Sequence, residues 1–155
     1  MKRLFFFLLG LAVILAGTVL VLRLVIYDVA RMDNLDMWPT CGRGAWMLVN
    51  RRVEPKRGDL VIFQLPGKSL QVRRVMAVPG DRVAVRGGAP IVNGLAVEQP
   101  AKSGARRDVA EQPQAGYFVM ADNRDKAADS REYGPVAREH IRGVVQLFFT
   151  RGEGP

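Results

Sequence analysis

The sequence opens with a long apolar run that restricts how this chain can fold. Between Leu4 and Leu22 lie 19 residues without a single charge, and Lys2 and Arg3 precede them. A helix rises ~1.5 Å per residue, so the run covers about 28 Å, close to the ~30 Å hydrocarbon core of a bilayer. A cleaved signal peptide is the alternative, but its apolar region is usually ~7–15 residues long and ends at small residues. The sequence therefore predicts a retained membrane anchor over residues 1–27.

Charges predict how this anchor is oriented and what its surroundings are. Because basic residues favour the cytoplasmic side, Lys2 and Arg3 place the N-terminus inside and residues 28–155 outside, although Arg23 and Arg31 oppose this slightly. Without Lys2 and Arg3, 21 basic residues face 15 acidic ones. This surplus favours contact with anionic lipid headgroups. The bases are scattered and the domain is expected outside the cytoplasm, so no nucleic acid partner is predicted.

The chain has one cysteine, Cys41, and one histidine, His140. An intramolecular disulfide needs two cysteines, and a structural zinc site needs four ligands drawn mainly from these two residue types. We therefore predict no disulfide within the chain, no metal and no cofactor.

Beyond the anchor, short apolar runs alternate with turn signals. Such a pattern is typical of an antiparallel β-sandwich or barrel-like fold, so we predict a mainly β domain. Residues 99–116, rich in proline, glycine, glutamine and charge, are expected to form a long loop. Asn93-Gly94 fits a type I′ hairpin turn. The predicted strands cover residues 46–50, 60–65, 70–78, 82–86, 91–97, 117–121 and 144–150.

Four motif blocks follow the anchor in order. They are Asn34-Leu35-Asp36-Met37-Trp38-Pro39-Thr40, the segment Arg57 to Phe63, the segment Arg73 to Asp81, and the segment Ala121 to Val136. Together with the anchor, these blocks resemble the type I signal peptidases, which are membrane-anchored serine proteases with a Ser–Lys dyad.

The resemblance implies a mostly antiparallel β-domain at the bacterial inner (cytoplasmic) membrane, single-pass and extracytoplasmic, with a cleft that faces the membrane surface. It also implies that residues 28–155 form one domain, in which the short stretch at about 82–116 is a reduced accessory insertion.

This chain departs from the family pattern where the chemistry is expected. Asp36 stands at the position of the serine nucleophile, and Arg73 stands at the position of the lysine base. Asp36 has no hydroxyl, and an arginine stays protonated at any relevant pH, so it cannot act as a base. Ala121 replaces a glycine beside the lysine, and Ala127 replaces a serine that orients it. We therefore expect the mechanism to be lost, and Asp36 and Arg73 to face each other as an ion pair.

The resemblance also assigns roles to neighbouring residues. Asn34, Met37 and Pro39 are expected near the oxyanion position and the cleft. A buried, hydrogen-bonded charge network near the cleft is expected from the fourth block, whose members are Asp122, Asn123, Arg124, Asp125, Asp129, Ser130 and Arg131.

Other residues could in principle replace the dyad. Cys41 and His140 are a nucleophile type and a base type, Lys126 lies beside the missing orienting serine, and Asp36 with Asp129 could form an aspartic pair. A small apolar role for Cys41 and a surface position for His140, near the start of a strand, are the simpler interpretations.

Three functions follow as hypotheses. The first is an inactive signal peptidase homologue that binds extended precursor segments, or assists assembly or secretion of exported proteins, with precursors and secretion or pilus assembly components as its partners. The second is an active signal peptidase that cleaves signal peptides through a non-standard site. The third is a structural member of a secretion complex that uses the anchor and the basic surface.

Overall fold

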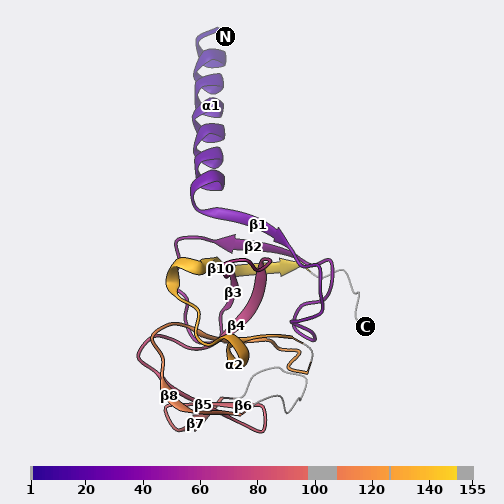
Figure 1. Ribbon diagram of the computed structural model, residues 1–155. Helices are drawn as coiled ribbons and strands as arrows, with labels where there is room; N and C mark the ends of the chain where they lie inside the picture. Colours follow the sequence, from indigo (N-terminus) through magenta and orange to yellow (C-terminus); the bar gives the residue numbers. More distant parts are fainter. Residues whose placement is uncertain (1, 98–107, 126, 150–155) are drawn as a thin grey trace.

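The computed structural model describes residues 2–97, 108–125 and 127–149. The helix α1 (Lys2–Val25) stands apart from the β-rich remainder of the chain (Figure 1). None of its residues is buried within the protein. By length and composition it can cross a membrane, which fits the predicted anchor.

A six-stranded antiparallel sheet follows, in the order β1-β2-β10-β3-β4-β9. The predicted mainly β, antiparallel fold is thereby confirmed. Its strands are β1 (Tyr27–Arg31), β2 (Trp46–Asn50), β3 (Leu60–Phe63), β4 (Gln71–Ala77), β9 (Phe118–Met120) and β10 (Ile141–Phe149).

A second, four-stranded sheet in the order β7-β6-β5-β8 lies at the end of the molecule that is far from α1 (Figure 1). Its strands are β5 (Arg82–Arg86), β6 (Ala89–Val92), β7 (Leu95–Ala96) and β8 (Val109–Pro113). Asn93 and Gly94 join β6 to β7 with φ angles of 52° and 81°. Both angles are positive, as a type I′ turn requires.

The two sheets share a core of valine, methionine and phenylalanine. One cluster, around Met37, Met47 and Val49, fills the space beneath β2 and the first motif block. Another joins Met76 and Phe118 of the large sheet to the small sheet's valines. Two short helices, α2 (Ser130–Tyr133) and η1 (Arg138–His140), connect β9 to β10.

Three parts of the sequence-based prediction need correction. The expected loop over residues 99–116 contains β8, because Val109–Pro113 pairs with β5. The strand β1 was not predicted, although Tyr27–Arg31 pairs with β2. The last strand begins at Ile141 rather than at Val144. Residues 98–107 and the end of the chain from Thr150 lie outside the described part.

Candidate functional site

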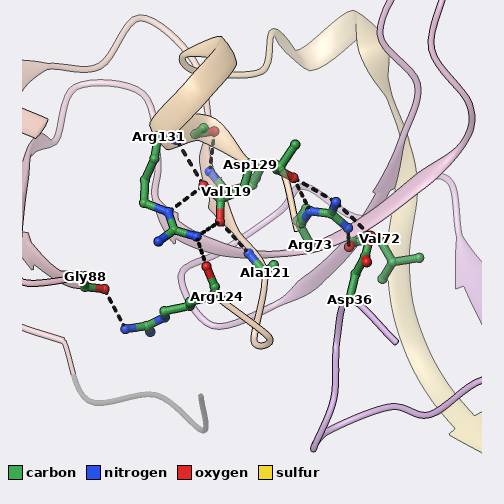
Figure 2. A network of polar contacts seen from close by, with 11 residues as sticks. Asp36, Val72, Arg73, Gly88, Val119, Ala121, Arg124, Asp129 and Arg131 are labelled. Carbon is green, nitrogen blue, oxygen red and sulfur yellow. Dashed lines mark hydrogen bonds and ion pairs between the residues drawn. The ribbon is translucent and has the colours of Figure 1, made fainter. Parts of the chain in front are cut away.

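Asp36 and Arg73 form an ion pair, as the sequence predicted. Arg73 Nη2 lies 2.9 Å from Asp36 Oδ2. The side chain of Arg73 is only 3% exposed, whereas that of Asp36 is 25% exposed. Figure 2 shows the carboxylate and the guanidinium pointing at each other. The two residues that the sequence resemblance assigned to the nucleophile and base positions therefore lie side by side.

Backbone carbonyls hold Arg73 in place as well. Its Nε and Nη2 donate to the carbonyl of Ala128 at 2.9 and 2.8 Å, and its Nη1 donates to the carbonyl of Val72 at 2.6 Å. All three guanidinium nitrogens are thus engaged. Ala127 is buried and directly precedes Ala128, whose carbonyl accepts from Arg73.

Strand geometry sends the next arginine to the opposite face, because side chains alternate along a strand. Arg74 donates through Nε and Nη2 to Asp122, at 3.0 and 2.6 Å. Asp122 is fully buried and also accepts from the hydroxyl of Thr40. A second ion pair, almost fully buried, therefore ties β4 to the first and the fourth motif blocks.

Asp129 and Arg131 make the third buried pair. Nε and Nη2 of Arg131 each lie 2.8 Å from the Asp129 carboxylate, and both side chains are almost fully buried. Asp129 also accepts from the backbone N–H groups of Arg131 and Ala121, so it caps α2 and fixes the end of β9. Ser130 Oγ accepts from Val119 N–H.

Asn123 joins the fourth block to the segment that carries Asp36. Its backbone N–H donates to the Asp36 carbonyl at 2.9 Å, and its Nδ2 donates to the Leu35 carbonyl at 3.1 Å. These bonds hold the backbone of Asp36 next to the charge network.

Arg124 reaches away from the pair, toward the small sheet (Figure 2). Its Nη1 donates to the Gly88 carbonyl at 2.9 Å, and its own carbonyl accepts from Arg131 Nη2. Burial, and then the charge of Arg131, lowers the pKa of Arg124. Of the residues expected in this network, Asp125 is exposed, whereas the others are buried and hydrogen-bonded: Asp122, Asn123, Arg124, Asp129, Ser130 and Arg131.

The residues expected near the cleft have different surroundings. Asn34 is exposed, and its Oδ1 accepts from the backbone N–H of Asp36 at 3.1 Å. Pro39 is exposed and follows Trp38 through a cis peptide bond. Met37 is fully buried among the apolar side chains beneath β2, so its side chain belongs to the core.

The other candidates for catalysis are not brought together. Cys41 is buried in the same core cluster, and burial followed by the charge of Asp122 raises the pKa of its thiol, which disfavours a thiolate. His140 instead lines a small pocket beside the β3–β4 turn. Asp36 is paired with Arg73 and Asp129 with Arg131, so these two aspartates do not form a dyad. Lys126 lies outside the described residues.

Among residues 2–97, 108–125 and 127–149, no three histidine, cysteine, aspartate or glutamate side chains are grouped as metal ligands. The charges at the site are instead arginine–carboxylate pairs.

Beside the ion pair, the outer edge of β4 has no strand partner among the described residues. Val75 exchanges backbone hydrogen bonds with Asp59 and Gly58 on the β3 side, so by alternation the N–H and carbonyl of Val72 point to the other side. There β9 pairs only with Arg74 to Ala77. Arg73 Nη1 covers the Val72 carbonyl at this edge.

An apolar groove of about 580 Å³ lies where α1 meets the large sheet. Its lining includes Leu22 of α1, Val29 of β1 and Trp46 of β2, together with Leu147 and Phe149 of β10. All except Leu22 belong to the sheet, and these four are more than half exposed. Apolar surface of this kind on the anchor side fits a position close to lipid.

Sequence reasoning missed two members of the charge network, Arg74 and Thr40. Both stand inside motif blocks, and the alternation of side chains in β4 was the signal that Arg74 must face a different partner from Arg73. Nothing in the sequence indicated that the carbonyls of Val72 and Ala128 bind Arg73.

Comparisons with known proteins agree with this architecture. The family model "Signal peptidase, peptidase S26" matches residues 4–150. Signal peptidase I V of Bacillus subtilis (strain 168) is 31% identical over 94% of this chain and 98% of its own length. Signal peptidase I of Bacillus licheniformis is 30% identical over 90% of this chain and 83% of its own.

A solved structure shares the fold. The crystal structure of a signal peptidase I from Enterococcus faecalis V583 aligns with a TM-score of 0.50 at 24% identity, covering 59% of this chain and 97% of that one. The family model matches nearly the entire chain, and one relative matches over 98% of its own length. The chain therefore belongs to the signal peptidase family, peptidase S26.

Proposed function

We propose that this protein is a membrane-anchored signal peptidase I homologue that does not hydrolyse signal peptides and instead binds extended segments of exported proteins. The observation that carries the proposal is the ion pair between Asp36 and Arg73. It occupies the place where the family pattern puts a hydroxyl and a neutral amine.

The chemistry of both groups supports the loss of hydrolysis. A hydrolytic serine needs a base with a free lone pair, and a guanidinium offers none. Arg73 is also held by Asp36 and two backbone carbonyls, so it has no freedom to approach a substrate. Asp36 carries no hydroxyl proton to remove, and its carboxylate is already paired.

The edge of β4 supports binding of an extended chain. Val72 presents backbone groups on the side of β4 that β9 leaves unpaired, next to Arg73 of the ion pair. A peptide could add there as a further strand through main-chain hydrogen bonds. Arg73 competes for the Val72 carbonyl, so binding at this edge would be weaker than on an unoccupied strand.

We further propose that α1 crosses the cytoplasmic membrane of a bacterium with residues 28–155 outside. Lys2 and Arg3 at the N-terminal end of the helix support this orientation. The exposed apolar groove beside the end of α1 and the basic surplus of the domain support contact with an anionic lipid surface. A reporter fused after Pro155 that is active only in the cytoplasm would refute the orientation.

A cleavage assay tests the loss of hydrolysis. The purified full chain in detergent is incubated with a preprotein, and an active signal peptidase I serves as the positive control. We expect no cleavage. Turnover that disappears in Asp36→Ala would contradict the proposal, whereas turnover that persists in Asp36→Ala would indicate a contaminant or another site, which purification to constant specific activity separates.

A crosslinking experiment tests the binding site. A photo-reactive residue at Asn34, beside the ion pair, is compared with one at Leu95, which is 73% exposed on the small sheet. We expect a purified exported precursor to crosslink to position 34 and not to position 95. Crosslinks only through α1 would favour the structural member of a secretion complex instead.

A further inference from the structure

Besides Arg73, which is paired with Asp36, three buried arginines lie in or against the fourth motif block, and among the described residues only two of these three are paired with a carboxylate. Arg74 presents its Nε and Nη2 to Asp122, and Arg131 presents the same two nitrogens to Asp129. This edge of a guanidinium matches the two oxygens of a carboxylate. Arg124 is the third, and its Nε and Nη2 are buried without a hydrogen-bond partner in the part of the chain that the structure describes.

The unfilled edge of Arg124 is an energetic problem. Buried polar groups are almost always hydrogen-bonded, and a buried charge without compensation destabilises a fold strongly. Arg124 is 8% exposed, and among the described residues its side chain makes one hydrogen bond, from Nη1 to the Gly88 carbonyl. A neutral carbonyl does not balance the charge, and the carboxylates of Asp122 and Asp129, which also act on Arg124, are already paired with Arg74 and Arg131.

A further buried donor belongs to Arg131, whose side chain contacts the backbone of Arg124. Nη1 of Arg131 is also buried and has no partner among residues 2–97, 108–125 and 127–149, and Arg131 Nη2 donates to the backbone carbonyl of Arg124. Figure 2 shows both guanidinium groups on the same side of the segment that joins them. The two charges are close enough for Arg131 to lower the pKa of Arg124.

From these contacts we infer an anion site formed by the Nε and Nη2 of Arg124 with Nη1 of Arg131, whose ligand is a carboxylate. The two carboxylate oxygens of the ligand accept hydrogen bonds from Nε and Nη2 of Arg124. A remaining lone pair of the carboxylate accepts from Nη1 of Arg131. The next residue, Asp125, is exposed, so the site lies just beneath the surface. It is separate from the Asp36–Arg73 pair and does not depend on the proposed function.

The carboxylate can come from a free small anion or from the end of a polypeptide. Sodium formate probes the first source. A short peptide with a free C-terminal carboxylate, compared with its C-terminal amide, probes the second. A response to formate alone assigns a free anion, and a response to the acid peptide that exceeds both formate and the amide assigns a peptide carboxylate.

Thermal unfolding of the full chain in detergent is the measurement, at constant ionic strength with sodium chloride as the reference salt. We expect a saturable rise in Tm of about 2–4 °C. Arg124→Lys keeps the charge but removes the two-pronged edge, and it should abolish the rise. Arg86→Gln, an exposed arginine of the same small sheet, is the matched control and should retain it.

Two outcomes overturn the inference. One is a Tm that responds no more to formate or to the acid peptide than to chloride, or that responds equally in Arg124→Lys and the unaltered chain. The other is a crystal structure, from crystals grown with formate, in which Arg124 is hydrogen-bonded only to water or to a carboxylate of the chain itself. The structural readout remains decisive if Arg124→Lys fails to fold.

Discussion

The Asp36 carboxylate lies 2.9 Å from the Arg73 guanidinium, and of the two only Asp36 has appreciable contact with solvent. Arg73 therefore depends on protein atoms for nearly all of its compensation, since its side chain is 3% exposed. The carbonyls of Ala128 and Val72 supply hydrogen bonds but no opposite charge.

Replacing Asp36 with alanine should therefore destabilise the domain. Loss of one partner from a largely buried pair leaves a charge uncompensated, and we expect a decrease of about 1–3 kcal/mol in the free energy of unfolding. Denaturant unfolding in detergent measures it. Asp28→Ala removes the exposed pair with Arg51 and should cost less than about 1 kcal/mol. Equal losses in the two variants would contradict a structural role for the pair at the site.

The enclosed pair of Arg74 and Asp122 should matter more. Asp122 is fully buried, so Asp122→Asn should lower the free energy of unfolding by about 3–5 kcal/mol. Thr40→Val removes only the hydroxyl that donates to Asp122 and should cost about 1 kcal/mol. If the two variants lost equal stability, the charge of Asp122 would not be what makes its pair with Arg74 important to the fold.

Restoring the dyad alone should not restore an enzyme. In Asp36→Ser with Arg73→Lys, the lysine lacks the orienting hydroxyl that the sequence resemblance implies at the position of Ala127. We expect preprotein cleavage far below that of an active signal peptidase I, and a gain of about 10–100-fold when Ala127→Ser is added. A double variant that is already fully active would show that this support is dispensable.

Acid should weaken the joint between the two sheets at Asp81. The Arg57 guanidinium, with further bonds from Val78 N–H and Asn93 Nδ2, holds the pKa of Asp81 below its ordinary value of 3.8. A carboxyl with a lowered folded pKa stabilises the fold above the unfolded value, and this contribution is lost as the pH falls through the folded value.

Unfolding measured from pH 6 down to pH 2 checks this. The stability difference between the unaltered chain and Asp81→Asn should shrink below about pH 4, toward the folded pKa. Asp33→Asn removes an exposed carboxylate and provides the control. A difference that is constant with pH would mean that Asp81 acts through hydrogen-bond geometry and not through its charge.

Local sequence patterns predicted the parts of the fold that are locally encoded. The apolar run of α1 and the Asn93-Gly94 turn carry their signals within a few residues. The strand β8 does not: Val109–Pro113 is short, polar and mostly exposed, and it is a strand because β5 pairs with it. Likewise, β1 owes its extended form to β2, a partner distant in the sequence.

The site divides in the same way. Motif positions placed Asp36 opposite Arg73, because the family pattern puts their counterparts in contact. The partners of Arg124 depend on where the small sheet meets the fourth block, and no motif encodes that distance. Gly88 lies 36 positions from Arg124 and became its partner only through the packing of the two sheets.

The joint between α1 and β1 has a mechanical consequence. Only Ile26 separates the two elements, and it is bonded on both sides: its N–H donates to Leu22 and its carbonyl accepts from Arg51 N–H of the chain leaving β2. No flexible linker separates α1 from β1. A change in the tilt of the helix would therefore rotate the whole sheet with it. The height at which Asp36 and Arg73 sit above a bilayer would thus be set by the helix itself.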